Sequence, residues 1–84
     1  MGRVKKTAEL GKIIRDHRKG LNLTLEKVSG LTQLSMRFLS ELERGKETAE
    51  LGKTLELLNR LGLEVIVQPR VYSAPSKSGE NNER

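Results

Sequence analysis

Five side chains between residues 35 and 41 have chemistry suited to the edges of DNA bases. Arg37 can donate two hydrogen bonds to O6 and N7 of a guanine, the commonest specific contact between protein and DNA. Met36 can pack on a thymine methyl group, and the hydroxyls of Ser35 and Ser40 can bond bases or phosphates. Glu41 can accept from cytosine N4 or orient Arg37 from four residues away; the second is favoured because phosphates repel an unpaired carboxylate. The alternative for Arg37 is a solvated surface arginine.

The positive charge of the chain is concentrated in its first half. Residues 1–46 contain 11 lysines and arginines and five acids, a net charge of +6, whereas the remaining residues contain five bases and six acids, a net charge of −1. This asymmetry is typical of a protein whose first part faces a polyanion, although a solvated basic surface has the same composition. No apolar run is long enough to span a bilayer and the first residues lack a secretory signal, so we expect a cytoplasmic protein without a membrane partner.

The sequence offers little for catalysis or metal binding. There is one histidine, His17, and no cysteine, so a metal site made of protein ligands is not expected. No phosphate-binding loop or nucleophile motif is present. We therefore interpret His17 as a histidine at the edge of the core and expect a protein that is not an enzyme and has no cofactor.

Four helices are predicted to position these side chains, which makes the fold class all-α. The first helix has an apolar stripe and is expected to be capped by Thr7 and ended by Gly20. The second follows Thr24, and the third follows Ser35 and stops at Gly45. The fourth is expected to follow a Thr48 cap and to end at Gly62. The expected inward residues of the four helices are Leu10, Ile13, Ile14, His17 and Leu21; Leu25 or Val28, with Leu31; Phe38, Leu39 and Leu42; and Leu51, Thr54, Leu55, Leu57, Leu58 and Leu61.

One strand is predicted after the helices, at residues 63–68, which are rich in β-branched residues and are closed by Pro69. A single strand leaves its backbone groups unpaired, so we expect it to pair with a second copy across a two-fold axis. The dimer residues are then Leu63, Val65, Ile66 and Val67. The alternative is an extended segment laid against the helices. Residues 1–70 form one domain on this interpretation, and residues 71–84 are expected to be a disordered tail.

The second and third helices are separated by about four residues, the spacing of a helix-turn-helix. Leu23-Thr24-Leu25-Glu26-Lys27-Val28, followed by the segment from Leu34 to Lys46, resembles the phage-repressor-like (Cro/C1-type, XRE) helix-turn-helix family. The stretch Phe38-Leu39-Ser40-Glu41-Leu42-Glu43-Arg44-Gly45-Lys46, together with Leu61-Gly62-Leu63-Glu64-Val65 and a following strand, is similar to its HipB-like antitoxin branch. The resemblance covers about residues 7–70 and implies a four-helix, lambda-repressor-like domain.

The resemblance also assigns roles to residues. It implies that Ser35, Met36, Arg37, Ser40 and Glu41 meet base edges, and that Arg18 and Glu43 form a partly buried ion pair between the first and third helices. Phosphate contacts are expected from Thr24, Lys27, Arg44 and Lys46, with a non-specific share from the arm Arg3, Lys5 and Lys6.

Two positions depart from the pattern of the family. Leu25 stands where the family usually has a glutamine that supports a phosphate contact, so that contact is not expected to be the same here. Gln33 stands in the turn where a glycine or small residue is usual, and it can alter the turn geometry.

Three functions fit the sequence. The first is a repressor that binds an inverted-repeat operator as a homodimer and, as the HipB resemblance implies, is the antitoxin of a type II toxin–antitoxin module, autoregulating its operon and binding a HipA-like kinase toxin. The second is a free-standing repressor without a toxin partner. The third is a helical adaptor that binds only protein, which would bind no DNA.

Overall fold

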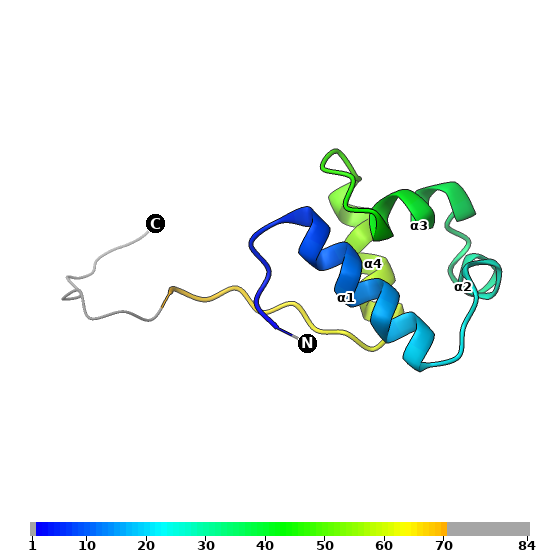
Figure 1. The fold of residues 1–84 in the computed structure, drawn as a ribbon, viewed down its shortest axis with the longest axis horizontal. Helices are drawn as coiled ribbons and strands as arrows, with labels where there is room; N and C mark the ends of the chain where they lie inside the picture. Colours follow the sequence, from blue (N-terminus) through cyan, green and yellow to red (C-terminus); the bar gives the residue numbers. More distant parts are fainter. Residues whose placement is uncertain (1, 71–84) are drawn as a thin grey trace.

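The computed structural model describes residues 2–70 and consists there of four helices and an extended segment. Helix α1 spans Thr7–Gly20, α2 Leu25–Thr32, α3 Met36–Glu43 and α4 Leu51–Arg60. Figure 1 shows the four helices gathered together, with residues 63–70 leaving them as an extended stretch. The predicted all-α, four-helix fold is therefore confirmed, and the predicted tail at 71–84 lies outside the described residues.

The core lies between the four helices and consists of aliphatic side chains contributed by all of them. Ile14, Val28, Leu39 and Leu57 are the most deeply buried, each no more than 2% exposed. The remaining buried apolar residues are Leu34, Leu42, Leu58 and Leu61. Burial of these side chains is the main stabilising contribution available to a chain without disulfides.

Some leucines predicted to be inward are exposed. Leu31 is 57% exposed and Leu51 is 70% exposed, and Leu21 and Leu55 are also on the surface. Of the inward residues expected for α4, Thr54, Leu57 and Leu58 are buried, as is Leu61 directly after the helix. Leu51 and Leu55 of α4 are thus apolar side chains that the four helices leave uncovered.

Two predicted N-caps are wrong. Helix α1 begins at Thr7 itself, and its first turn is closed by Glu9, whose carboxylate accepts from the backbone N–H of Lys6 at 3.1 Å. The Thr7 hydroxyl instead donates to the carbonyl oxygen of Gly45 at 2.7 Å. Helix α4 begins at Leu51, and Thr48 lies in the preceding turn.

The predicted helix ends are correct at two of three glycines. Gly45 and Gly62 have φ of +88° and +80°, the left-handed conformation that ends a helix. Gly20 is still within α1, and Asn22, with φ of +61°, takes the left-handed position after that helix. Asparagine is one of the few other residues that adopts this conformation readily.

Residues 63–70 have no regular secondary structure in the single chain. The backbone N–H of Leu63 closes α4 by donating to the carbonyl of Leu58 at 2.8 Å. Beyond it, Val65, Ile66 and Val67 are 54%, 72% and 92% exposed. A strand that pairs only with a second copy would look like this in one chain, so the predicted dimer strand remains a prediction.

Candidate nucleic-acid interface

Helix α3 presents its first turn to solvent while its opposite face is buried. Ser35 caps the helix by accepting from the N–H of Phe38 at 3.0 Å. Met36 is 47% exposed and the side chain of Arg37 is 87% exposed. Leu39 anchors the helix at 2% exposure. The side chains of Met36 and Arg37 are therefore accessible from solvent, as those of base-reading residues must be.

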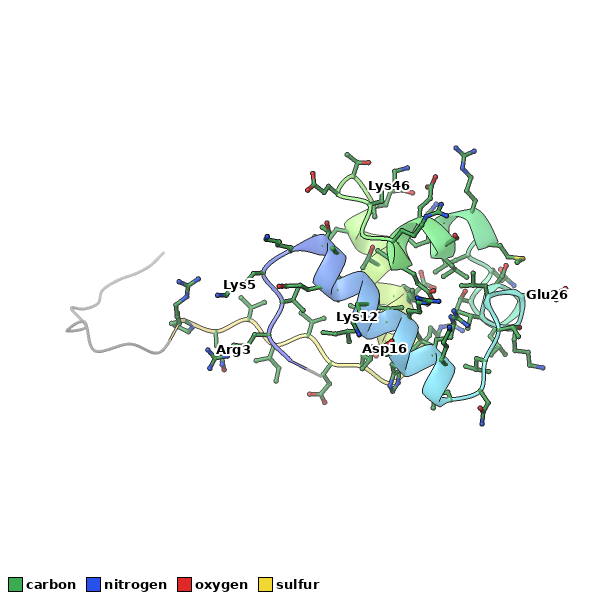
Figure 2. The ribbon with its side chains drawn as sticks, viewed as in Figure 1. Arg3, Lys5, Lys12, Asp16, Glu26 and Lys46 are labelled. Carbon is green, nitrogen blue, oxygen red and sulfur yellow. The ribbon has the colours of Figure 1, made fainter. Side chains whose placement is uncertain are left out.

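The carboxylate of Glu41 contacts two cations. Its Oε2 accepts from Nε of Arg37 at 3.3 Å, and its Oε1 accepts from Nζ of Lys46 at 3.0 Å. These contacts, with Lys46 the larger influence and Arg37 the second, hold the pKa of Glu41 below its ordinary value. Figure 2 shows Lys46 in the loop that follows α3. The structure thus connects a residue of the first turn of α3 to the loop after it.

A buried ion pair fixes α3 against α1. Arg18 donates through Nε to Oε2 of Glu43 at 2.7 Å and through Nη2 to Oε1 at 3.1 Å, and both side chains are only 9% exposed. A third donor of Arg18, Nη1, reaches the carbonyl of Leu23 at 2.6 Å. This carboxylate raises the pKa of Arg18 above its ordinary value. Because the fork is bidentate and nearly all of it is desolvated, it constrains the angle of α3 rather than adding much net stability.

Close backbone contact between α1 and the end of α3 is allowed by two glycines. A Cβ placed on Gly11 would lie 2.5 Å from the carbonyl oxygens of Leu42 and Glu43. A Cβ on Gly45 would lie 2.6 Å from Cα of Ala8. Gly11 was not among the residues predicted to matter; its position between two apolar residues of a helical stripe was the available signal.

The turn between α2 and α3 adopts the conformation usual for a glycine despite its glutamine. Gln33 has φ of +65° and ψ of 16°, in the left-handed region. The buried Thr32 stabilises the turn, because its hydroxyl donates to the carbonyl of Val28 at 2.8 Å and accepts from the N–H of Leu34 at 3.2 Å. Gln33, which stands where the family usually has a glycine or small residue, therefore holds a left-handed backbone conformation. That conformation costs a residue with a Cβ about 1 kcal/mol relative to the right-handed one.

The other predicted DNA-contacting residues lie near the two ends of the helix-turn-helix. Thr24 caps α2, accepting from the N–H of Lys27 at 3.0 Å. Thr24, Lys27 and Arg44 are exposed, and Ser40 is half-buried. Arg3 and Lys5 lie apart from α3, on the arm that leads into α1 (Figure 2).

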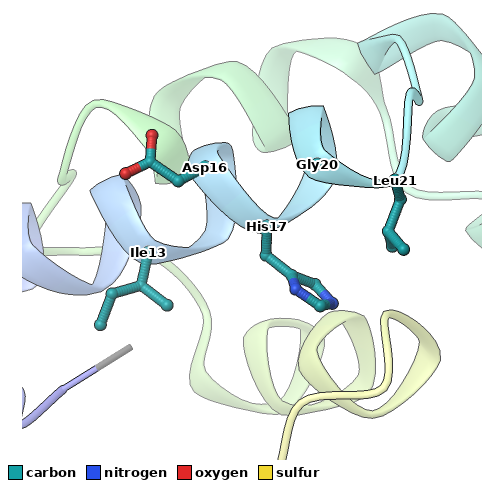
Figure 3. A pocket seen from close by; sticks show the side chains of 5 residues that line it. All are labelled: Ile13, Asp16, His17, Gly20 and Leu21. Atoms are coloured by element: carbon teal, nitrogen blue, oxygen red, sulfur yellow. The ribbon is translucent and has the colours of Figure 1, made fainter.

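His17 lies in an open depression beside the end of α4. Its Nε2 lies 2.7 Å from the carbonyl oxygen of Leu61, at the end of α4. The depression measures about 440 Å³ and is lined by Ile13, Asp16, His17, Gly20 and Leu21. In Figure 3 the Asp16 carboxylate points away from the imidazole.

Within residues 2–70 no three histidine or acidic side chains are grouped to hold a metal ion. Over the same residues, no helix has both the length and the apolarity to cross a membrane.

Comparisons with known proteins identify the family. No family model matches the chain. A curated protein of Sinorhizobium fredii, the uncharacterized HTH-type transcriptional regulator y4mF, is 38% identical over 63 residues, which are 75% of this chain and 83% of that protein. Among solved structures, a chain of a HipB–O4 20mer complex superposes with a TM-score of 0.75 and a chain of a HipA–HipB–O2–O3 complex with 0.74, each at 13% identity over 82% of this chain and 97% of the other. At that identity, the structural likeness establishes the fold. The chain belongs to the HTH-type transcriptional regulators and has the helix-turn-helix fold of HipB.

Proposed function

We propose that this regulator is a sequence-specific repressor that binds an inverted-repeat operator as a homodimer. The observation that carries the proposal is the presentation of α3: a first turn with Arg37 87% exposed, on a helix held by a buried, bidentate ion pair. A base-reading helix needs long exposed side chains on a rigid support, and α3 has both. On this proposal the protein binds DNA in the cytoplasm and is not an enzyme.

The residues divide into base readers and phosphate ligands. Arg37 is proposed to read guanine, with Met36 on a thymine methyl. The Ser35 oxygen caps α3, but its O–H remains able to donate to a base or phosphate. Thr24, Lys27, Arg44 and Lys46 are proposed to contact phosphates, which set the position of the protein without reading sequence. Ser40 and Glu41 complete the proposed base-facing set.

A dimer is proposed because one helix-turn-helix unit is small. Such a unit buries about 600–1,000 Å² on DNA, typically too little for tight specific binding. The exposed Val65, Ile66 and Val67, together with the uncovered leucines of α4, are surfaces that a second copy would bury. Leu63, the first residue of the proposed dimer set, is half-buried against the core of its own chain. Residues 64–68 make no backbone hydrogen bond with the described residues 2–70, and their N–H and C=O groups would gain partners from the same contact.

We further propose that the protein is a HipB-like antitoxin whose partner is a HipA-like kinase toxin. Support comes from the fold, which is that of HipB, including the chain bound to HipA and DNA in the HipA–HipB–O2–O3 complex. Co-expression with the product of the adjacent gene tests this: a stable complex is expected. Absence of a complex with an adjacent kinase, or of any kinase gene, would leave a free-standing repressor.

The test of DNA binding is selection from randomised duplexes, followed by a salt titration. An inverted repeat with half-site centres about 34 Å apart is expected, and the logarithm of affinity should fall by about 0.9 per neutralised phosphate for each unit of log salt. A selected site without two-fold symmetry would contradict the dimer. Failure to enrich any sequence would contradict DNA recognition and favour the protein-binding adaptor.

A further inference from the structure

Glu41 is a carboxylate on the surface proposed to face DNA, where phosphates repel negative charge. Its side chain is 26% exposed, and it contacts Arg37 and Lys46 with separate oxygens. The backbone reinforces the arrangement, since the carbonyl of Glu41 accepts from the N–H groups of Arg44 at 3.2 Å and Lys46 at 3.0 Å. The loop after α3 is thus folded back onto the residue that also contacts Arg37.

The two cations differ in what they can do while paired. Arg37 contacts Glu41 through Nε, and its terminal Nη1 and Nη2 make no hydrogen bond with any of residues 2–70. A bidentate contact to guanine requires two N–H donors of the guanidinium fork, so Arg37 can read guanine through its terminal nitrogens and keep Glu41 neutralised. The ammonium of Lys46 is a point charge that a phosphate attracts away from the carboxylate.

The cost of the carboxylate therefore depends on the DNA sequence. Opposite a guanine, the guanidinium stays beside Glu41 while it makes its base contact. Adenine and thymine each offer one acceptor in the major groove and cytosine offers none, so opposite these bases a phosphate competes for the guanidinium of Arg37. If Arg37 turns to the phosphate, Glu41 faces the polyanion without its partner. Bringing like charges together at an interface costs binding free energy. An unpaired Glu41 beside phosphates therefore weakens the complex with DNA that lacks the guanine more than the complex with the operator.

We propose that Glu41 is a specificity-determining residue which, by holding Arg37 and Lys46 together, weakens binding to DNA that lacks a guanine opposite Arg37. The inference rests on the proposed DNA-binding function. It gives Glu41 a role distinct from accepting a hydrogen bond from cytosine, because the effect is exerted on non-specific DNA.

The test is Glu41→Gln, which keeps the shape of the side chain and removes its charge. Affinity for random duplex DNA should rise by about three- to tenfold, and the salt dependence of that binding should steepen by up to about 0.9 as one more cation reaches a phosphate. Affinity for the selected operator should change by less, so the ratio of specific to non-specific affinity falls. The additional cation is Arg37, since Lys46 already contacts a phosphate in the wild type, so in an Arg37→Ala background the steepening on random DNA should disappear.

The matched control is Asp16→Asn on the surface of α1. Asp16 pairs with Lys12 at 2.9 Å, so this variant also removes one negative charge and releases one lysine, away from α3. It should leave the affinity ratio unchanged. Equal gains on operator and random DNA for Glu41→Gln would overturn the proposal as a general charge effect, and loss on the operator alone would identify a direct base acceptor. If wild-type protein shows no operator preference, the DNA-binding function itself fails, which is a separate result.

Discussion

At the scale of single residues, Arg37 and Lys46 share one carboxylate but differ in their geometry. Arg37 projects from the first turn of α3 and is 87% exposed, whereas Lys46 is 45% exposed in the loop after it. A fork of donors suits a base edge, and a point charge suits a phosphate. The same acidic partner therefore serves two cations with different proposed targets.

Truncation of the two cations should separate these targets. Arg37→Ala is expected to cost about 1–3 kcal/mol on the selected operator and little on random DNA, because a lost base contact matters only where the base is present. Lys46→Ala should weaken both complexes similarly and reduce the salt slope by about 0.9. Fluorescence anisotropy titrations on both duplexes measure this. Equal losses for Arg37→Ala on the two duplexes would make Arg37 a phosphate ligand.

The acidic partner has a titration that can be followed directly. Lys46 and Arg37 hold the pKa of Glu41 below its ordinary value of 4.5, so the contacts are complete above that pH and are lost as the pH falls through the lowered pKa. NMR of the side-chain carboxyl should report the lowered pKa, and Lys46→Ala should raise it toward 4.5. The carboxyl of Asp16, whose pKa is lowered mainly by its hydrogen bond to Lys12, is the internal control and should not move. An unchanged Glu41 titration in Lys46→Ala would show that the ion pair is absent in solution.

At the scale of helices, the angle of α3 depends on how closely α1 approaches it. The buried pair of Arg18 and Glu43 sets the direction, and Gly11 allows contact with the carbonyls of Leu42 and Glu43. These groups are backbone atoms, which cannot turn aside as a flexible side chain can. The seam between α1 and α3 is therefore sensitive to a single methyl group.

Gly11→Ala should destabilise the protein although alanine is the better helix former. Its Cβ would lie 2.5 Å from two carbonyl oxygens, so the helices must separate, at a cost of about 1–3 kcal/mol. Gly20→Ala in the same helix meets nothing within 4 Å and should be neutral or stabilising by up to about 1 kcal/mol. Urea denaturation of both variants tests the comparison. Equal stabilities would mean that α1 and α3 are not in close contact at Gly11.

The number and order of the helices could be predicted from sequence, but several of their details could not. Helical periodicity identified the core positions of α3 correctly, because the buried Leu39 and Leu42 recur at the period of one face. The cap at Thr7 was wrong because its hydroxyl bonds to Gly45, 38 residues away, and local patterns carry no information about that distance. Leu51 looked inward because an apolar stripe does not reveal whether a neighbour exists to cover it.

The interface could be located from sequence only in part. The resemblance to a known family assigned Arg18 and Glu43 to one ion pair, and the spacing of four residues suggested the contact of Arg37 with Glu41. The second contact of Glu41, with Lys46, depends on the loop folding back over α3. This loop conformation requires the left-handed backbone of Gly45. A rule based on the spacing of two charged residues along a helix does not describe such a loop.

At the scale of the whole molecule, the apolar surface left by one chain is the basis for the proposed dimer. Val65→Pro should give a monomer that does not bind the operator, because proline removes a backbone donor from the middle of the proposed strand. The helices should remain folded, since Val65 is 54% exposed and lies outside them. Sedimentation measures the mass, and circular dichroism measures the helices.

Val65→Thr is the control, because threonine keeps both the β-branch and the N–H and should stay dimeric. A dimer that survives Val65→Pro would place the contact on the helices, with the exposed Leu51 and Leu55 of α4 as the next surface to alter.

The burial of the Arg18–Glu43 pair has a practical consequence for handling the protein. Dissolved salt weakens the interaction of exposed charges that lie farther apart than about 10 Å at 0.1 M ionic strength. It weakens a buried ion pair, here only 9% exposed, much less. Exposed lysines and arginines that hold nucleic acid are thus weakened by concentrated salt, while the pair that supports α3 is not. Contaminating DNA can therefore be washed from the protein on a column in concentrated salt, and the eluted protein should recover binding on dilution without refolding.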